Sequence, residues 1–140
     1  MAIAAFDIGG TNIKYGVLNR QGNICYKAKI STKSKEGGVA IIGKIRVIAK
    51  QLQNNYDLTG IAVSTAGQVD NREGVVIHAT ESLPGYTGLH IKKELETTFG
   101  LPVTVDNDVN CAALGEYWKG AAYQLVNKYF LKNQLLTLLH

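Results

Sequence analysis

The apolar and polar positions in the first third of the chain predict three strands joined as a meander. Residues 2–8 and 13–18 are apolar runs, and residues 24–30 alternate in part between apolar and polar side chains. Such alternation is typical of a half-exposed strand. Residues 19–23 are rich in turn formers, and residues 31–38 form a polar loop. The chain is therefore expected to begin with three antiparallel strands.

Helical spacing follows over residues 39–53. Lys44, Lys50 and Gln53 face away from an apolar stripe, which consists of Val39, Ile42, Ile45, Ile48, Ala49 and Leu52. This arrangement predicts an amphipathic helix. The near-continuous apolar run 58–64 then predicts a buried strand of the kind found in parallel sheets. A strand, a helix and a second strand in this order form a crossover unit.

Shorter elements occupy the second half of the chain. The pattern predicts a small-residue loop at 65–70, a short strand at 75–77, an irregular segment at 80–88, a helix at 91–99, a strand at 103–105 and a helix at 109–119. Gly100 and Pro102 suit the end of the first of these helices. Together the elements predict an α/β fold: a mixed sheet with an N-terminal antiparallel meander and crossover helices.

Length and composition narrow the class of protein. The 140 residues, 46% of them apolar, suit one globular domain, and no apolar run approaches a membrane span. Without a signal-type segment, we expect a cytoplasmic protein with no membrane partner. The net charge is +4, and Lys27, Lys29, Lys33 and Lys35 are interpreted as a solvated strand face. No aromatic interleaving accompanies them, so nucleic acid is not an expected partner.

The cysteines and histidines carry no metal-ligand spacing. Cys25 and Cys111 lie far apart in the sequence and are expected to be buried, reduced thiols, as is usual in a cytosolic protein. His78 and His90 are isolated from each other and from other ligand types. The sequence therefore does not predict a histidine metal site.

The first candidate site is the turn between the first two strands. Asp7 ends the first strand, Gly9 and Gly10 form the turn, and Thr11, Asn12 and Lys14 follow. Paired glycines let backbone N–H groups approach an anion closely. The turn is thus suited to holding phosphate beside a carboxylate, although a plain structural turn fits Gly-Gly-Thr as well.

Three polar segments follow predicted strands and are expected to meet. They are Asp7, the segment Ser64 to Asp70, and the segment Asp106 to Asp108. In an open α/β sheet, ligands bind outside the carboxyl ends of the strands. We therefore expect one cleft at this edge, built from segments that are distant in the sequence.

Asp108 is the sharpest candidate for chemistry. A carboxylate at a strand end and helix start could accept a proton from an attacking alcohol, but it could also be a simple N-cap. Asn107 could bind sugar hydroxyls or serve as a turn residue. Asp106 could be a pocket wall or a solvated charge. Glu81, Ser82, Gly85 and Tyr86 could line a substrate pocket or cover the core.

Four motifs, in this order along the chain, resemble the N-terminal half of the ROK family, whose name stands for repressors, open reading frames and sugar kinases. They are Asp7-x-Gly9-Gly10-Thr11, Ser64-x-x-Gly67-x-Val69-Asp70, Leu83-Pro84-Gly85-Tyr86 and Asn107-Asp108-x-Asn110-x-Ala112-x-x-Gly115-Glu116. The resemblance covers residues 1–124. It implies an actin-like ATPase, or ribonuclease H-like, fold, of which these residues would be the N-terminal lobe.

The resemblance also implies an activity: transfer of a phosphoryl group from ATP, with Mg²⁺, to a hydroxyl of a hexose or β-glucoside. The sequence looks closest to the glucokinase and β-glucoside kinase types of Gram-positive bacteria, with N-acetylmannosamine and fructose kinases still open. Asp108 would be the catalytic base, and Asp7 would lie near Mg²⁺. The sugar would contact Asn107, Glu81, Ser82, Gly85, Tyr86, Ser64 and Gly67. Phosphate would lie against Asp7, Gly9, Gly10, Thr11, Asn12 and Lys14.

The C-terminal residues depart from the family pattern. Gly120 is the last glycine, so the family's second glycine-rich phosphate loop is missing, together with its Glu-x-x-Gly-His sugar motif and its cysteine-rich structural zinc site. Residues 125–140 predict instead a divergent amphipathic helical tail. Its broad apolar surface needs a partner, for example a second copy of the chain in a homodimer.

These features predict an N-terminal fragment of a sugar kinase that is inactive alone. One alternative is a non-catalytic sugar-binding or dimerisation module. A ROK-type transcriptional regulator is less favoured, because the first strand begins at Ala2 and leaves no room for a DNA-binding segment before it.

Overall fold

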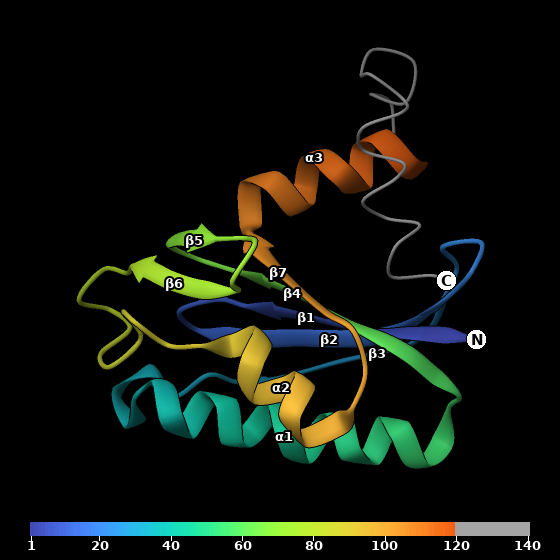
Figure 1. Ribbon diagram of the computed structural model, residues 1–140, viewed down its shortest axis with the longest axis horizontal. Coiled ribbons are helices and arrows are strands. Elements are labelled where there is room, and N and C mark those ends of the chain that lie inside the picture. Colours follow the sequence, from blue (N-terminus) through green and yellow to red (C-terminus); the bar gives the residue numbers. More distant parts are fainter. Residues whose placement is uncertain (120–140) are drawn as a thin grey trace.

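A five-stranded mixed sheet forms the centre of the protein in the computed structural model, which describes residues 1–119 (Figure 1). Strands β1 (Ala2–Ile8), β2 (Asn12–Asn19) and β3 (Ile24–Ser31) form the predicted antiparallel meander. Strands β4 (Leu58–Thr65) and β7 (Val103–Asn107) extend the sheet in parallel to β1, in the order β3-β2-β1-β4-β7. The α/β prediction is confirmed; the predicted tail at 125–140 lies outside the described residues.

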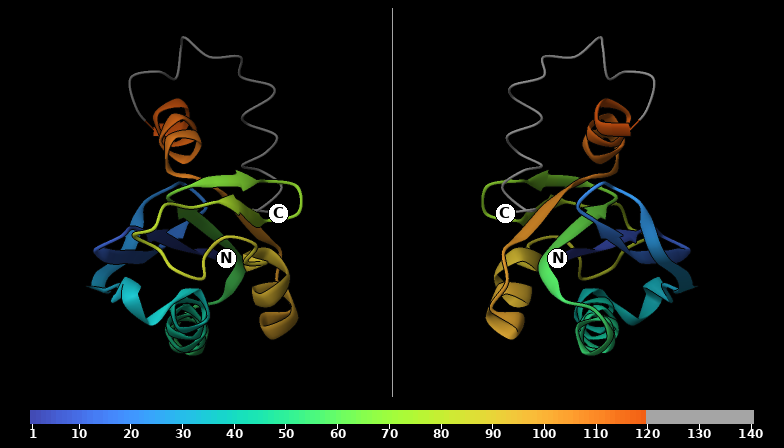
Figure 2. Two further views of the ribbon diagram at one scale, coloured as in Figure 1. Left: turned by 90° about the vertical axis from the view of Figure 1, so that its left-hand side faces the viewer. Right: turned by 90° about the vertical axis from the view of Figure 1, so that its right-hand side faces the viewer.

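Helices lie on both sides of this sheet (Figures 1 and 2). Helices α1 (Gly38–Asn55) and α2 (Ile91–Phe99) lie on one face, and α3 (Asp108–Lys119) crosses the other. A single 3-10 turn, η1 (Ser34–Glu36), precedes α1. None of the helices in the described part of the chain is long and apolar enough to cross a membrane.

A small second sheet was not predicted in full. Strands β5 (Gln68–Asp70) and β6 (Val75–His78) pair as an antiparallel hairpin on the α3 side of the main sheet. The prediction of a loop over residues 65–70 was therefore wrong for its second half. The three residues of β5 are too few for an alternating pattern to be recognised. They form a strand because they pair with β6.

The main core lies between the sheet and the α1–α2 layer. Alternate strand residues such as Phe6, Ile8, Val63 and Val105 are buried there. Helix α1 contributes Ile41, Ile42, Ile45, Ile48, Ala49 and Leu52.

One residue of the predicted apolar stripe was assigned to the wrong face. Val39 is 79% exposed, whereas Ile41 is fully buried. The first turn of α1 packs against the 80–88 loop: the Gly38 N–H donates to the Pro84 carbonyl (3.1 Å), and a Cβ on Gly38 would lie 2.5 Å from the Gly85 carbonyl oxygen. This contact holds the start of the helix against the loop, while helical spacing places Ile41 on the buried face and Val39 outside it.

Two surface predictions also need correction. Cys25 is exposed on the edge strand β3 and Cys111 is only partly buried, so neither is the buried thiol that was expected, although both are free. The four lysines are all exposed, but Lys33 and Lys35 lie beyond the end of β3. Only Lys27 and Lys29 therefore belong to a strand face.

Candidate active site

A row of polar residues crosses the sheet near the carboxyl ends of its parallel strands. Asp7 on β1 is the register partner of Lys14 on β2 and of Ser64 on β4, and Ser64 is in turn the partner of Asp106 on β7. Residues in register share one face of a sheet, and this face is the one that α3 crosses. The expected meeting of the three polar segments is thus present in the backbone pairing.

The surroundings of Cys111 show how close these groups are. Burial raises the pKa of the Cys111 thiol, while a hydrogen bond with Ser64 acts to lower it. The carboxylates of Asp106, Asp7 and Asp108 all raise this pKa further, because a negative charge nearby disfavours a thiolate. One sulfur atom on the first turn of α3 thus lies within electrostatic range of all three carboxylates.

Asp106 is not a solvated charge. Its side chain is only 7% exposed, and the strand β7 extends through it to Asn107. Its Oδ1 accepts hydrogen bonds from the Asn107 backbone N–H (2.8 Å) and from Asn110 Nδ2 (3.0 Å). Its Oδ2 accepts from Asn71 Nδ2 (3.3 Å), in the turn between β5 and β6. Asp106 therefore connects the sheet, α3 and the small hairpin.

The capping of α3 leaves Asp108 available. Asn107 Oδ1 accepts a hydrogen bond from the Asn110 backbone N–H at 2.8 Å, which makes Asn107 the N-cap. Asp108 is the first helical residue and is exposed. Its carboxylate forms no hydrogen bond or ion pair with the described residues. The interpretation of Asp108 as the cap was therefore wrong, and this carboxylate is free for chemistry.

The β1–β2 turn is closed by a hydrogen bond from the Gly9 N–H to the Asn12 carbonyl (2.9 Å). Gly10 and Thr11 are exposed at its tip. A Cβ placed on Gly10 would meet no heavy atom within 4 Å. Nothing in the described chain therefore requires glycine at this position, whereas an anion that approaches the backbone closely would require it.

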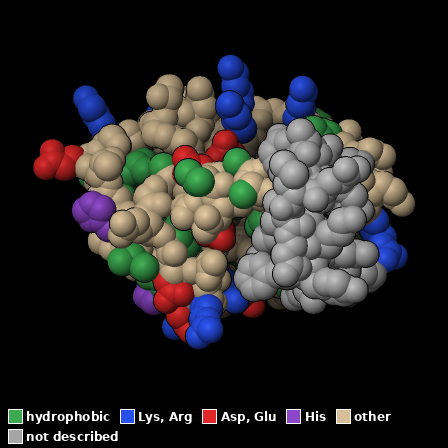
Figure 3. All heavy atoms as spheres, turned by 90° about the horizontal axis from the view of Figure 1, so that it is seen from above, with side chains coloured by type: hydrophobic (Ala, Val, Ile, Leu, Met, Phe, Trp, Pro, Cys, Tyr) green, Lys and Arg blue, Asp and Glu red, His purple; other side chains and the backbone are tan. Residues whose placement is uncertain are grey.

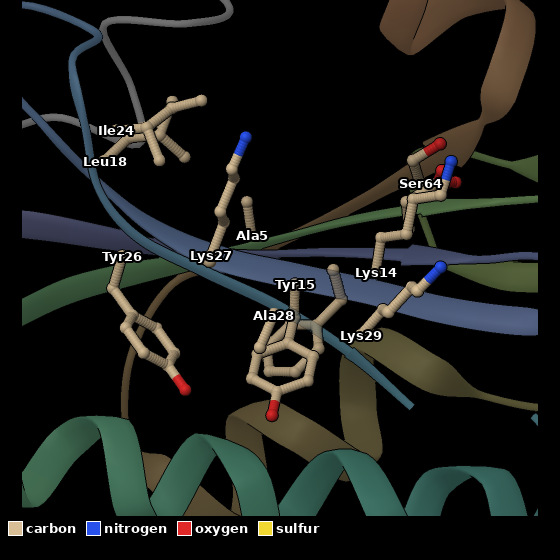
Figure 4. Close-up of a pocket in the computed structure, with 13 residues that line it drawn as sticks. Ala5, Lys14, Tyr15, Leu18, Ile24, Tyr26, Lys27, Ala28, Lys29 and Ser64 are labelled. Carbon is tan, nitrogen blue, oxygen red and sulfur yellow. The ribbon is translucent and has the colours of Figure 1, made fainter. Parts of the chain in front are cut away.

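A hollow of about 540 Å³ lies over β1, β2 and β3 next to this row of residues. Its lining includes Asp7, Lys14 and Ser64. Figure 4 shows Lys14 and Ser64 on the α3 side of the sheet, while Tyr15 and Tyr26 point toward α1. On this side of the molecule, some acidic side chains lie within the face, whereas the basic ones stand at its margins, where further acidic side chains also lie (Figure 3). Asp7 and Lys14 thus lie at one hollow on the α3 side of the sheet.

The irregular segment 80–88, which contains the predicted sugar contacts between Glu81 and Tyr86, has both buried and exposed residues. Leu83 and Tyr86 are buried, and the Tyr86 hydroxyl forms a hydrogen bond with Thr65 Oγ1. Burial raises the pKa of Tyr86 to about 12, and the bond to Thr65 acts to lower it. The side chains of Glu81 and Ser82 are exposed, as is Gly85. Within the described chain, no hydrogen bond joins this loop to Asn107 or Asp108. Tyr86 is thus a core residue that anchors the loop to β4.

Gly67 has a structural requirement for glycine. Its φ is 99°, and a Cβ there would lie 2.7 Å from the His78 carbonyl oxygen. Glycine is therefore needed for the turn between β4 and β5, whether or not a sugar binds beside it.

Four polar residues around the site were not assigned a role from the sequence: Thr32, Asn71, Asn110 and Cys111. Three of them act through hydrogen bonds to residues distant along the chain, such as Asn71 with Asp106 and Thr32 with Gly9. Only Asn110 stood within a recognisable motif. A pattern of residue types carries no signal for the other three.

The fold is that of an actin-like ATPase lobe, and solved ROK sugar kinases share it. A ROK family glucokinase from Streptomyces griseus, in complex with glucose and AMPPNP, superimposes with a TM-score of 0.77 at 31% identity over 87% of this chain and 38% of that one. The ROK hexokinase from Thermus thermophilus gives a TM-score of 0.76, also at 31% identity, over 89% of this chain and 41% of that one.

The chain belongs to the ROK family, whose model matches residues 3–131. The β-glucoside kinase of Listeria monocytogenes is 40% identical over 129 residues, which are 89% of this chain and 41% of that protein. The glucokinase of Halalkalibacterium halodurans is 39% identical over 120 residues, or 82% and 36% of the two chains. The chain thus spans about 40% of the length of the relatives it matches.

Proposed function

We propose that this chain supplies the sugar-binding and base-bearing half of the active site of an ATP-dependent sugar kinase. The observation that carries the proposal is the free, exposed carboxylate of Asp108 at the start of α3. Together with Asp7 and Asp106 it acts on the Cys111 thiol, at the edge where open α/β sheets bind ligands. The substrate class is a hexose or a β-glucoside, as the names of the relatives suggest.

Asp108 acts as the general base in this proposal. It accepts the proton of the sugar hydroxyl that attacks the terminal phosphoryl group of ATP, a role that contributes about 10²–10⁴-fold to the rate. Asn107 Oδ1 is already engaged with the helix, but its amide nitrogen remains a donor for a sugar hydroxyl. Glu81, Ser82, Gly85, Ser64 and Gly67 complete the proposed sugar contacts, and Tyr86 supports the loop from the core.

The β1–β2 turn holds phosphate in this proposal. Gly10 and Thr11 offer backbone N–H groups, Thr11 and Asn12 offer polar side chains, and Lys14 adds a cation. Gly9, whose N–H is bonded to the Asn12 carbonyl, closes the turn and leaves room for the phosphate to approach. MgATP supplies the phosphoryl group when bound. No cluster of three ligand side chains suited to a metal occurs among the described residues, but Mg²⁺ is commonly held by one or two carboxylates together with phosphates and water. The exposed Asp7 carboxylate, which has no partner in the described chain, fits that requirement.

We further propose that residues 1–124 are the N-terminal lobe of such a kinase and that residues 125–140 are a divergent tail. The relatives are much longer than this chain, and efficient phosphoryl transfer needs charge stabilisation on several sides of the phosphate. In this proposal, the lobe alone binds sugar and phosphate. Catalytic turnover requires a second lobe as well.

The deciding experiment measures sugar-dependent ADP release from Mg-ATP, with a panel of hexoses and β-glucosides, together with sugar binding by calorimetry. The variants are Asp108→Asn and, as a matched control, Asp57→Asn. Asp57 is exposed at the opposite end of β4 and pairs with the N-terminus (3.6 Å). We expect sugar to bind to the chain and to both variants.

Any turnover should be lost in Asp108→Asn and kept in Asp57→Asn. Sugar-dependent turnover that survives Asp108→Asn would contradict the role of the base. A chain that binds none of these sugars would contradict the proposed function. Sugar binding without turnover, even after a second lobe is supplied, would favour a non-catalytic binding module.

A further inference from the structure

A buried hydroxyl lies directly beneath the β1–β2 turn. Thr32, the residue after β3, is fully buried although it is polar. Its Oγ1 donates a hydrogen bond to the Gly9 carbonyl (2.7 Å), and its backbone N–H donates to the Thr11 carbonyl (2.9 Å). One residue thus holds both sides of the turn from the protein interior.

This double contact determines where the turn directs its donors. In a planar trans peptide the C=O group and the following N–H group point in opposite directions. Because Thr32 draws the Gly9 carbonyl inward, the Gly10 N–H of the same peptide unit points away from the interior. The N–H groups of Gly10 and Thr11 donate to no described residue.

We infer that Thr32 is a positioning residue that aims the Gly10 N–H at a bound phosphate. The inference rests on the proposed function, since it deepens the phosphate-binding role of the turn. Thr32 itself touches no ligand, because it is fully buried. It acts by fixing one peptide unit before the anion arrives, so that little conformational freedom is lost on binding.

Lys44 extends the support to helix α1. Its Nζ donates to the Thr32 carbonyl (2.7 Å) and forms an ion pair with Glu36 (3.2 Å). The segment between β3 and α1 is therefore held on both sides, with Thr32 bonded to the turn above and to the helix below. A shift of α1 would be transmitted to the phosphate-binding peptide through these contacts.

The test compares phosphate binding by three variants with that of the unmodified chain. Thr32→Val keeps the shape of the side chain but removes the donor, and Thr32→Ser keeps the donor. Thr59→Val is the matched control, because Thr59 Oγ1 also donates to a backbone carbonyl, that of Ala2 (3.3 Å), at the far end of the sheet. Tripolyphosphate and Mg-ATP are titrated into the ¹⁵N-labelled full chain, and melting curves confirm that each variant is folded.

We expect Thr32→Val to bind either ligand about 3- to 10-fold more weakly, which corresponds to the loss of one hydrogen bond. Thr32→Ser and Thr59→Val should bind as the unmodified chain does. Without ligand, Thr32→Val should shift the Gly10 amide resonance, and Thr59→Val should not.

Unchanged affinity in Thr32→Val would overturn this inference alone. Equal weakening in Thr59→Val would also overturn it, because the effect would then come from general stability. An unmodified chain that binds neither tripolyphosphate nor Mg-ATP would overturn the phosphate-binding part of the proposed function as well.

Discussion

Three consecutive polar residues at the end of β7 have different surroundings and therefore different tasks. Asp106 is buried and accepts three hydrogen bonds, Asn107 caps α3, and Asp108 is exposed without a partner in the described chain. A carboxylate that is free of structural bonds can change its protonation state with little effect on the fold. Only Asp108 meets that condition among the three.

Gly10→Ala separates phosphate binding from folding. Because a Cβ at this position meets no atom within 4 Å, we expect the free energy of unfolding to change by less than about 0.5 kcal/mol. The added methyl group would stand where an anion approaches the backbone, so Mg-ATP or tripolyphosphate should bind about 10-fold more weakly. Titration calorimetry and urea unfolding give the two quantities.

The control for this variant is Gly43→Ala, inside helix α1. A Cβ there is equally free of contacts. Alanine is the better helix former, so the variant should be more stable by about 0.5–1 kcal/mol and should bind phosphate normally. If Gly10→Ala also bound phosphate normally, the turn would be a plain structural turn.

Tyr86 should make stability depend on pH in the alkaline range. Its pKa is raised from 10.0 to about 12, chiefly by burial, so the neutral phenol is favoured in the folded state. This stabilisation is complete below about pH 10 and is lost as the pH rises through about 12. The stability difference between the unmodified chain and Tyr86→Phe should therefore narrow by roughly 1 kcal/mol from about pH 9 to about pH 11. Urea unfolding at each pH measures the two free energies of unfolding. A difference between the two proteins that stays constant with pH would contradict the burial of the phenol.

Helix α3 depends on its first residues for its position over the sheet. Asn107 caps it and Asn110 ties it to Asp106. Asn107→Ala should lower the free energy of unfolding by about 1 kcal/mol, whereas Asn107→Ser, which keeps a capping oxygen, should lower it by less. Thermal unfolding followed by circular dichroism would detect the difference.

The same pair of variants tests the proposed sugar contact. Serine restores the cap but not the amide donor. Sugar binding should therefore weaken in both variants. If Asn107→Ser regained full sugar affinity, the side chain would act only as a cap.

Long elements were predictable because their patterns were long. The 18 residues of α1 repeat the apolar spacing several times, β1 is apolar over most of its length, and β2 and β4 are apolar over about half of theirs. Val39 was nevertheless assigned to the buried stripe, although at about 100° per residue the stripe of Ile42, Ile45 and Leu52 includes Ile41 and leaves Val39 outside it. Strand β5 has three residues, and only its partner β6 makes it a strand.

At the scale of the whole molecule, the core is built from the described part of the chain before α3. Its buried apolar residues run from Ala2 to Val105. A chain shortened after Gln124 should therefore unfold cooperatively, at a denaturant concentration close to that of the full chain. Urea unfolding measures this stability, and loss of cooperative unfolding would contradict the proposed lobe boundary.

If the tail holds two copies of the full chain together as a dimer, the shortened chain should have the mass of a monomer. Sedimentation measures this mass.

The site as a whole was predictable only in outline. The rule that ligands bind at the carboxyl ends of strands predicted that Asp7, Ser64 and Asp108 would lie at one edge of the sheet, and the structure places these segments near one another. That a ligand binds there stays a prediction. The rule could not show that Asp106 is buried, that Tyr86 lies in the core, or that Thr32 supports the turn. Each of these depends on contacts between segments that are distant in the sequence. The same residue types could equally well lie at the surface, so the sequence alone does not distinguish the two cases.

Alternate residues of β1 point to opposite faces of the sheet. Ile3, Ala5 and Asp7 face the α3 side, whereas Ala4, Phe6 and Ile8 fill the core. Because every second residue serves one face, the chemistry on this sheet can be altered without repacking the interior, and the interior can be varied without touching the chemistry. An insertion or deletion of one residue in β1 is the exception, because it would exchange the two faces beyond it. This sheet should therefore tolerate substitutions on its α3 side far better than insertions or deletions within β1.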